Sequence, residues 1–340
     1  MSIIDSMGRP TIKDVAAKSG VSKTTVSVIL NQSPASARVS RQTQDRVKLV
    51  AEQLGYRPNW RARALSNQRT HTIGVLYTPP MPLIVRGNYE GIMIGINQVL
   101  HKEGYHLLLV PLGENPDEWG SVLLDQRMDG CLVLSRLRDP LPALLKKSRL
   151  PTTLVNADPA HGLPVVVADD YEGAVQCTQH LIKLGHREIT FLLSHQPQHF
   201  SIELRQRGYT DAMTEAGLGA HVRIATDTLE DFAKGLRSSS QRPTALVVFT
   251  HFTAVKLLQV LWDQGIRVPD DLSVATFSNA YPVEDCIPPL TTIALPTEEM
   301  VRAAANLLLE QINKGQEAEP RCITLKETLV ERRSTAPLGK

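Results

Sequence analysis

Short polar side chains and one cation gather between residues 22 and 31 of this chain. Ser22, Lys23, Thr24, Thr25 and Ser27 stand at spacings that place them at the start of one expected helix and on its outward face. Hydroxyl and ammonium groups on such a face donate hydrogen bonds to phosphates and to base edges in the major groove. The chemistry that these residues predict is therefore non-covalent recognition of DNA.

Two short helices are expected to position this face within Thr11–Asn31. Thr11 is a good N-cap, and Gly20 stands where the first helix must stop, at a position that favours a positive φ. Ser22 caps the second helix, whose buried side would hold Val26, Ile29 and Leu30. The pattern predicts a helix-turn-helix with Ser22–Asn31 as the recognition helix. The alternative is a plain pair of helices around a glycine turn that binds nothing.

The distribution of charge favours a helix-turn-helix that binds DNA over a helix pair that binds nothing. Residues 1–70 hold twelve Lys and Arg against four Asp and Glu, a net charge of +8, whereas the remaining 270 residues hold 25 against 31, a net charge of −6. A basic head on a mildly acidic body is typical of a protein that binds phosphates through one end.

Length and composition indicate a cytoplasmic protein of more than one domain. The chain has 340 residues, 42% of them hydrophobic and 21% charged. It shows no apolar run long enough to span a membrane and no signal-peptide core, so no membrane association is expected. Four cysteines lie far apart without zinc-ligand spacing, which predicts reduced thiols, no metal site and no cofactor.

Ser40 is expected to cap a third helix at Gln42–Leu54, which completes a small helical head. Next, Asn59 can cap a short helix at Trp60–Leu65, which is too short to be stable alone. A polar connector follows at residues 66–71.

From residue 72 onward, apolar strands alternate with helices, which predicts parallel sheets. The series runs twice, so we expect an α/β body of two doubly wound lobes behind the all-helical head. The expected domains are a head at 1–56, a hinge at 57–71 and a two-lobed body at 72–335. Within the body, the N-lobe takes 72–167 plus 296–323 and the C-lobe takes 168–295 plus 324–335.

Several short motifs stand in a specific order. These are T-I-x-D-V-A from Thr11, G-V-S from Gly20, T-V-S from Thr25, Y-x-P-N from Tyr56, and R-A-R-A-L at Arg61–Leu65. In the body, G-H-R at Gly185, R-P-T-A at Arg242 and P-P-L-T at Pro288 follow. Over about residues 11–335 the chain resembles the LacI/GalR family of bacterial transcription regulators.

The resemblance implies which residues of the head and hinge contact DNA. Leu65 would wedge between base pairs in the minor groove, with Ala62 facing the hinge of a second subunit. Val28 stands where many members have an arginine. The expected DNA contacts are Thr11, Ser22, Lys23, Thr24, Thr25, Ser27, Asn31, Ser40, Thr43, Asn59, Ala62 and Leu65. The alternative for the hinge is a surface linker with one buried leucine.

An effector is expected in the crevice between the lobes, at the carboxyl ends of the strands. By resemblance, the contacts from the first lobe are Asn88 and Tyr89. His199, Ser201 and Arg205 match the loop from strand to helix in the second lobe, and Arg205 would hold hydroxyls or a carboxylate. The alternative for Arg205 is a surface arginine paired with Glu203 or Asp211.

Two departures from the family bear on the effector's charge. Thr250-His251 replaces Asn-Asp, and Ser278 replaces an aspartate that accepts hydrogen bonds from ligands. Without that acceptor, and with Arg205 in place, the crevice becomes more cationic. The residues therefore predict an anionic effector, a sugar acid or sugar phosphate, rather than a neutral sugar. The alternative is a pocket that differs from the family's or is degenerate.

Two other classes of protein fit the sequence less well. An enzyme of sugar or nucleoside metabolism with an accessory basic head is disfavoured, because no catalytic residue set, P-loop or nucleophile elbow is present. A two-lobed transport-type binding protein would carry a signal peptide and no basic head. We expect a non-enzymatic, effector-responsive repressor that acts at the bacterial nucleoid. It would bind a near-palindromic double-stranded operator as a homodimer, with a tetramer as the alternative.

Overall fold

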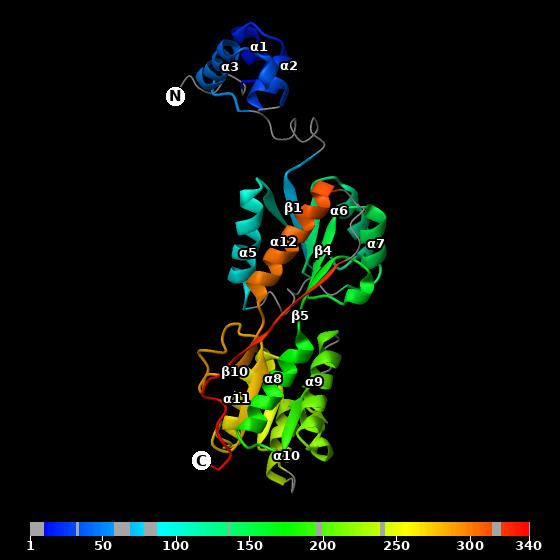
Figure 1. The fold of residues 1–340 in the computed structure, drawn as a ribbon, viewed down its shortest axis with the longest axis vertical. Helices are drawn as coiled ribbons and strands as arrows, with labels where there is room; N and C mark the ends of the chain where they lie inside the picture. The colour runs from blue at the N-terminus through cyan, green and yellow to red at the C-terminus, as the bar shows by residue number, and fades with distance from the viewer. Residues whose placement is uncertain are drawn as a thin grey trace. The chain divides into compact units, whose positions relative to one another are not determined.

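The computed structural model of the protein describes residues 10–31, 34–57, 69–77, 87–134, 137–194, 199–238, 242–314 and 321–339. The chain divides into two compact units, one made chiefly of residues 1–71 and the other chiefly of residues 72–340 (Figure 1). The hinge residues Asn59, Ala62 and Leu65 lie outside the described residues.

The described residues of the first unit form a bundle of three α-helices, drawn in blue in Figure 1. They are α1 (Ile12–Ser19), α2 (Lys23–Leu30) and α3 (Arg41–Gln53), with a 3-10 turn at Pro34–Arg38. Their apolar faces meet in one small core of Val15, Ala16, Val26, Ile29, Val47, Val50 and Ala51. The helix-turn-helix and the third helix that the sequence predicts are both present.

The second unit contains two six-stranded sheets, each with its own helices. The N-lobe sheet has the order β11-β5-β4-β3-β1-β2, and all its pairings are parallel. Its strands are β1 (Thr72–Tyr77), β2 (His106–Pro111), β3 (Gly130–Val133), β4 (Thr152–Val155), β5 (Val165–Ala168) and β11 (Cys322–Leu325). Its helices are α5 (Tyr89–Lys102), α6 (Trp119–Leu124), α7 (Leu141–Ser148) and α12 (Thr297–Lys314).

The C-lobe sheet has the order β12-β10-β9-β8-β6-β7, in which only the pairing of β12 with β10 is antiparallel. Its strands are β6 (Ile189–Leu192), β7 (Arg223–Ala225), β8 (Ala245–Val248), β9 (Ser273–Phe277), β10 (Thr291–Ala294) and β12 (Thr328–Val330). Its helices are α8 (Asp170–Lys183), α9 (Ser201–Glu215), α10 (Leu229–Ser238) and α11 (His251–Asp263).

Alternation of side chains along the strands places helices on both faces of the C-lobe sheet. Phe191 and Val247 pack with α8 and α9, whereas Leu192 and Val248, their neighbours along the strands, pack with α10 and α11. This is the doubly wound arrangement that the alternation of strands and helices predicts. The N-lobe sheet is parallel throughout, and the C-lobe sheet is parallel except at β12.

Three segments of chain run between the lobes (Figure 1). The first crossover joins β5 to α8 through Asp169, the second joins β10 to α12 through Leu295 and Pro296, and the third joins β11 to β12 through Lys326 and Glu327. Because β11 extends to Leu325, the third crossover begins two residues later than the boundary expected at residue 323.

Candidate DNA interface and effector crevice

Local hydrogen bonds fix both ends of the helix-turn-helix. The Asp14 carboxylate accepts hydrogen bonds from the Thr11 N–H and hydroxyl, each at 2.8 Å, and these bonds lower the pKa of Asp14. The Ser22 hydroxyl accepts from the Thr25 N–H at 3.1 Å, and Gly20 ends α1 with φ +69°. These contacts explain why Thr11, Gly20 and Ser22 mark helix boundaries in the sequence.

The recognition helix presents its first turn to solvent. Ser22, Lys23 and Thr24 are exposed, whereas Val26 and Ile29 are buried in the core of the head. Thr25, Ser27 and Asn31 are half-buried: the Asn31 amide donates to Ser27 Oγ at 3.1 Å, and the Thr25 and Ser22 hydroxyls lie 2.9 Å apart. The exposed polar side chains are therefore concentrated at the start of α2, where the sequence predicts contacts with base edges.

The expected contacts beyond α2 lie at the start of α3. Ser40 Oγ accepts from the Thr43 N–H at 3.3 Å, so Ser40 caps α3 as predicted. The Ser40 and Thr43 hydroxyls both lie at the N-terminus of α3, where backbone N–H groups and the helix dipole favour binding of a phosphate.

In the C-lobe, the helix that carries the expected effector contacts begins earlier than the sequence predicts. The family resemblance placed His199, Ser201 and Arg205 in the loop before the helix, but Ser201 is the first residue of α9. His199 Nδ1 lies 2.7 Å from the Ser201 hydroxyl, and His199 Nε2 lies 3.3 Å from the Asn156 carbonyl oxygen, just beyond β4. His199 therefore links the C-lobe to the N-lobe.

Arg205 contacts two carboxyl groups that were not predicted from the sequence. Its Nη2 lies 2.6 Å from Asp170 Oδ1 and 3.3 Å from Glu327 Oε1. All three side chains are buried, and neither Glu203 nor Asp211 is the partner. Asp170 begins α8 directly after the first crossover, and Glu327 lies 157 residues later in the third crossover, so no local sequence pattern indicated this cluster.

Close helix packing brings the cluster together. A Cβ atom on Gly208 would lie 2.4 Å from the Tyr171 carbonyl oxygen, so this glycine lets α9 approach the start of α8. A Cβ atom on Gly173 would lie 1.7 Å from Glu327 Oε2, so only a glycine there leaves room for the Glu327 carboxyl group. Burial raises the pKa of Glu327 to about 8; the Arg205 charge opposes this shift and Asp170 adds to it.

The remaining expected contacts lie at the carboxyl ends of β8 and β9. His251 is 2% exposed and is the first residue of α11, directly after Thr250. Ser278 follows β9 with φ +80°, and its N–H donates to the Ile293 carbonyl at 2.7 Å. Both stand at the edge of the sheet where α/β proteins bind ligands.

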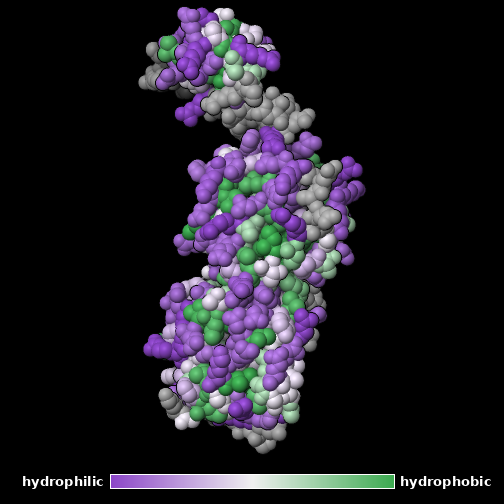
Figure 2. Space-filling model, in the orientation of Figure 1, coloured by the Kyte–Doolittle hydropathy of each residue, from purple (hydrophilic) through white to green (hydrophobic). Residues whose placement is uncertain are grey.

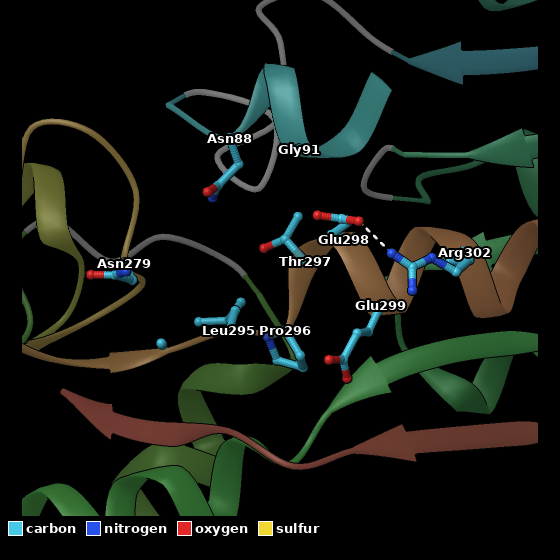
Figure 3. A pocket seen from close by; sticks show the side chains of 10 residues that line it. Asn88, Gly91, Asn279, Leu295, Pro296, Thr297, Glu298, Glu299 and Arg302 are labelled. Atoms are coloured by element: carbon cyan, nitrogen blue, oxygen red, sulfur yellow. Dashed lines mark hydrogen bonds and ion pairs between the residues drawn. The ribbon is translucent and has the colours of Figure 1, made fainter. Parts of the chain in front are cut away.

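A pocket of about 380 Å³ opens beside the second crossover. Figure 3 shows Asn88, at the start of α5, directed toward it across from Asn279 and from the first turn of α12. The lining also contains Gly91, Ala294, Leu295, Pro296, Thr297, Glu298, Glu299 and Arg302. Of the expected effector contacts only Asn88 lies here; Tyr89, His199, Ser201, Arg205, Thr250, His251 and Ser278 do not line it.

Metal chemistry finds no support in the described parts of the chain. No group of three or more His, Cys, Asp or Glu residues there could hold a metal ion, and the four cysteines are free. Nor is any helix in those parts long and apolar enough to cross a bilayer.

A helix-turn-helix head joined to a two-lobed α/β body defines a class of ligand-binding regulators of DNA. Comparison with known proteins agrees. Residues 11–59 match the model of bacterial regulatory proteins of the lacI family, and residues 178–335 match a periplasmic binding protein-like domain.

The similarity extends over nearly the whole chain. The HTH-type transcriptional repressor PurR of Vibrio atlanticus is 32% identical, over 97% of this chain and 99% of its own length. The HTH-type transcriptional regulator CelR of Thermobifida fusca is 32% identical, over 96% and 98%. This chain belongs to the lacI family of bacterial regulatory proteins.

Solved structures share the architecture. A complex of the transcriptional regulator CelR with cellobiose has a TM-score of 0.67 and 29% identity, over 96% of this chain and all of its own. A lac repressor dimer bound to operator and an anti-inducer has a TM-score of 0.79, over 97% of this chain and all of its own, and at 23% identity it supports the fold alone.

Proposed function

We propose that this protein is a transcriptional repressor that binds a near-palindromic operator as a homodimer and responds to a small, sugar-like metabolite. The observation that carries the proposal is the exposed first turn of α2, with Ser22, Lys23 and Thr24 on a head of net charge +8. A relative in the family is named as a transcriptional repressor, and another was solved with cellobiose.

The body supports a role as the effector sensor. Its lobes are joined by three crossovers, and the carboxyl ends of both sheets hold hydroxyl, amide and imidazole groups, among them Asn156, Ser201 and Ser278. Such groups suit a hydroxyl-bearing ligand. A ligand that binds one arrangement of the lobes more tightly than another shifts the protein toward that arrangement.

A second copy of the chain is the proposed partner of an exposed apolar surface on the body. Tyr89 and Ile94 on α5 are exposed, as are Tyr281 and Ile287 in the loop after β9. A Cβ atom on Gly87, just before α5, would lie 2.8 Å from the Tyr281 carbonyl oxygen, so the two groups adjoin. The space-filling view shows apolar areas on both lobes among hydrophilic residues (Figure 2). We call Tyr89, Ile94, Tyr281 and Ile287 the apolar face.

Two copies would present two heads to the two halves of one operator, because a two-fold dimer imposes its symmetry on the site. We further propose that the segment containing Leu65 contacts the minor groove between the half-sites and that the protein acts on nucleoid DNA in the cytoplasm.

Selection of bound sequences from a random DNA library by the full-length protein tests this proposal. We expect enrichment of one near-palindromic motif, and we expect a chain that lacks the first 57 residues to enrich nothing. Retention of random sequences without a shared motif would contradict it.

A further inference from the structure

Arg205 lies beneath the carboxyl edge of the C-lobe sheet, where an effector is proposed to bind. It stands one turn after Ser201 on α9, and its guanidinium carbon lies 4.2 Å from the ring centre of Phe277 and 5.3 Å from that of Phe249. Phe277 ends β9 and Phe249 follows β8. An arginine at this place is well located to bind an acid group of a ligand.

The protein's own carboxyl groups already bind one nitrogen of this guanidinium group. Asp170 and Glu327 both contact its Nη2, aromatic rings lie beside it, and the arginine is only 5% exposed. A ligand carboxylate or phosphate that bound Nη2 would have to displace Asp170 from a contact of 2.6 Å, although the buried Nε of Arg205 has no hydrogen-bond partner. It would also bring a second negative charge beside buried carboxyl groups, which is unfavourable at low dielectric.

The cluster is close to neutral as a whole near pH 7. Burial raises the pKa of Glu327 to about 8, so its carboxyl group is largely protonated, and the ion pair of the cluster is the one between Arg205 and Asp170. The other titratable groups that act on this cluster are Asp169 and Cys177, and burial raises the pKa of the Cys177 thiol to about 12, so it is uncharged. Little positive charge is therefore left to attract an anion.

We propose that Asp170 and Glu327 are specificity-determining residues: Asp170 as an internal counter-ion, and Glu327 as a second partner on the same nitrogen, withhold Arg205 from the ligand, so that the crevice accepts an uncharged, hydroxyl-bearing effector and rejects sugar acids and sugar phosphates. This rests on the proposed effector role of the crevice. It replaces the anionic effector that the sequence predicts, because that prediction required an Arg205 without a carboxylate nearby.

Unpartnered polar atoms at the same sheet edges fit a neutral ligand. Among the described residues, the buried atoms Asn156 Oδ1 and Ser194 Oγ have no hydrogen-bond partner. They follow β4 and β6 at the carboxyl ends of the two sheets. An amide oxygen and a hydroxyl pair naturally with ligand O–H groups, and a buried polar group without a partner is costly.

The decisive test removes both acids that contact Arg205, so that its guanidinium group can bind an added anion. In the full-length double variant Asp170→Asn, Glu327→Gln the arginine keeps its surroundings but loses both acids. We expect inorganic phosphate at millimolar concentration to raise the Tm of this variant by several degrees relative to equal ionic strength of chloride. Wild type should show no such shift. The matched control, Asp170→Asn, Arg205→Gln, Glu327→Gln, has no buried cation and should also show none.

Equal phosphate responses of the double and triple variants, or no response from the folded double variant, would overturn the proposal. If the double variant does not fold even with phosphate, calorimetry on wild type decides. There we compare ribose, glucose and cellobiose with ribose 5-phosphate, glucose 6-phosphate and cellobionate. We expect each charged compound to bind at least tenfold more weakly than its neutral parent, and tighter binding of any charged member would refute the idea. Operator binding is measured on the same samples, because it tests the proposed regulator function independently of ligand charge.

Discussion

Lys23 and Arg205 are both cations, but the Lys23 side chain is exposed and the Arg205 side chain is buried. Lys23 projects from the exposed first turn of α2, where its ammonium group is available to another molecule. Arg205 is buried between two carboxyl groups of its own chain. Sequence position alone predicted that each side chain contacts another molecule, but only Lys23 is exposed.

Lys23→Ala should weaken binding to the preferred operator by about 1–3 kcal/mol and relax the choice at one or two base pairs, because a base-edge donor is lost. Titration of the variant against the preferred operator and against single-base variants of it measures both effects. An equal loss on every sequence, random DNA included, would show that Lys23 contacts a phosphate instead.

Glu327→Gln should change how stability depends on pH. The pKa of Glu327 is raised from 4.5 to about 8, so the folded protein holds this proton more tightly than the unfolded chain does. Its contribution to stability is therefore complete below about pH 4.5 and is lost as the pH rises to about 8. Glutamine resembles the protonated acid, so the variant should lose less Tm than wild type between pH 5 and pH 8.5. Parallel Tm curves would rule out a proton on Glu327.

At the scale of elements, the approach of α9 to α8 assembles the buried cluster. Gly208 allows this approach, because a methyl group there would meet the Tyr171 carbonyl and the Ala174 side chain. Gly208→Ala should therefore destabilise the C-lobe by about 1–3 kcal/mol, the usual cost of overpacking. Denaturant unfolding measures it, and Gly235→Ala on α10, where a Cβ would meet no atom within 4 Å, is the control.

Elements with strong local signals were predictable from sequence. Ser22 and Ser40 cap their helices, and apolar strands such as Val165–Ala168 form the interior of parallel sheets. Several elements, including α6, α7, α10 and β7, were not predicted; α6 and β7 have only six and three residues, too few to show a periodicity. The early start of α9 also escaped prediction, since Phe200 precedes the helix and provides no side-chain cap.

The candidate site was less predictable than the fold. A hydrogen bond joins His199 and Ser201, which are two residues apart, so this contact can be predicted from the local sequence. The partners of Arg205 are 157 residues apart in the chain, and Glu327 fits only because residue 173 is a glycine. Such a contact depends on the completed packing of α8, α9 and the third crossover, which no single stretch of sequence contains.

At the scale of the whole molecule, the proposed dimer depends on the apolar face. Ile287 is 92% exposed, so an aspartate there costs the monomer little but places a charge within the proposed interface. Ile287→Asp should shift sedimentation from dimer to monomer and weaken operator binding. Ile224→Asp, on the edge strand β7, is the control and should remain dimeric. A dimeric Ile287→Asp protein would place the interface elsewhere.

We propose that effector binding to the body and operator binding to the head are coupled. Thermodynamic linkage requires that an effector and an operator change each other's affinity by the same factor. The most direct test is to measure operator affinity with and without a bound sugar, and sugar affinity with and without the operator, on full-length protein. We predict equal factors of about five or more in the two directions. A sugar that binds the body tightly yet leaves operator affinity unchanged would contradict the account.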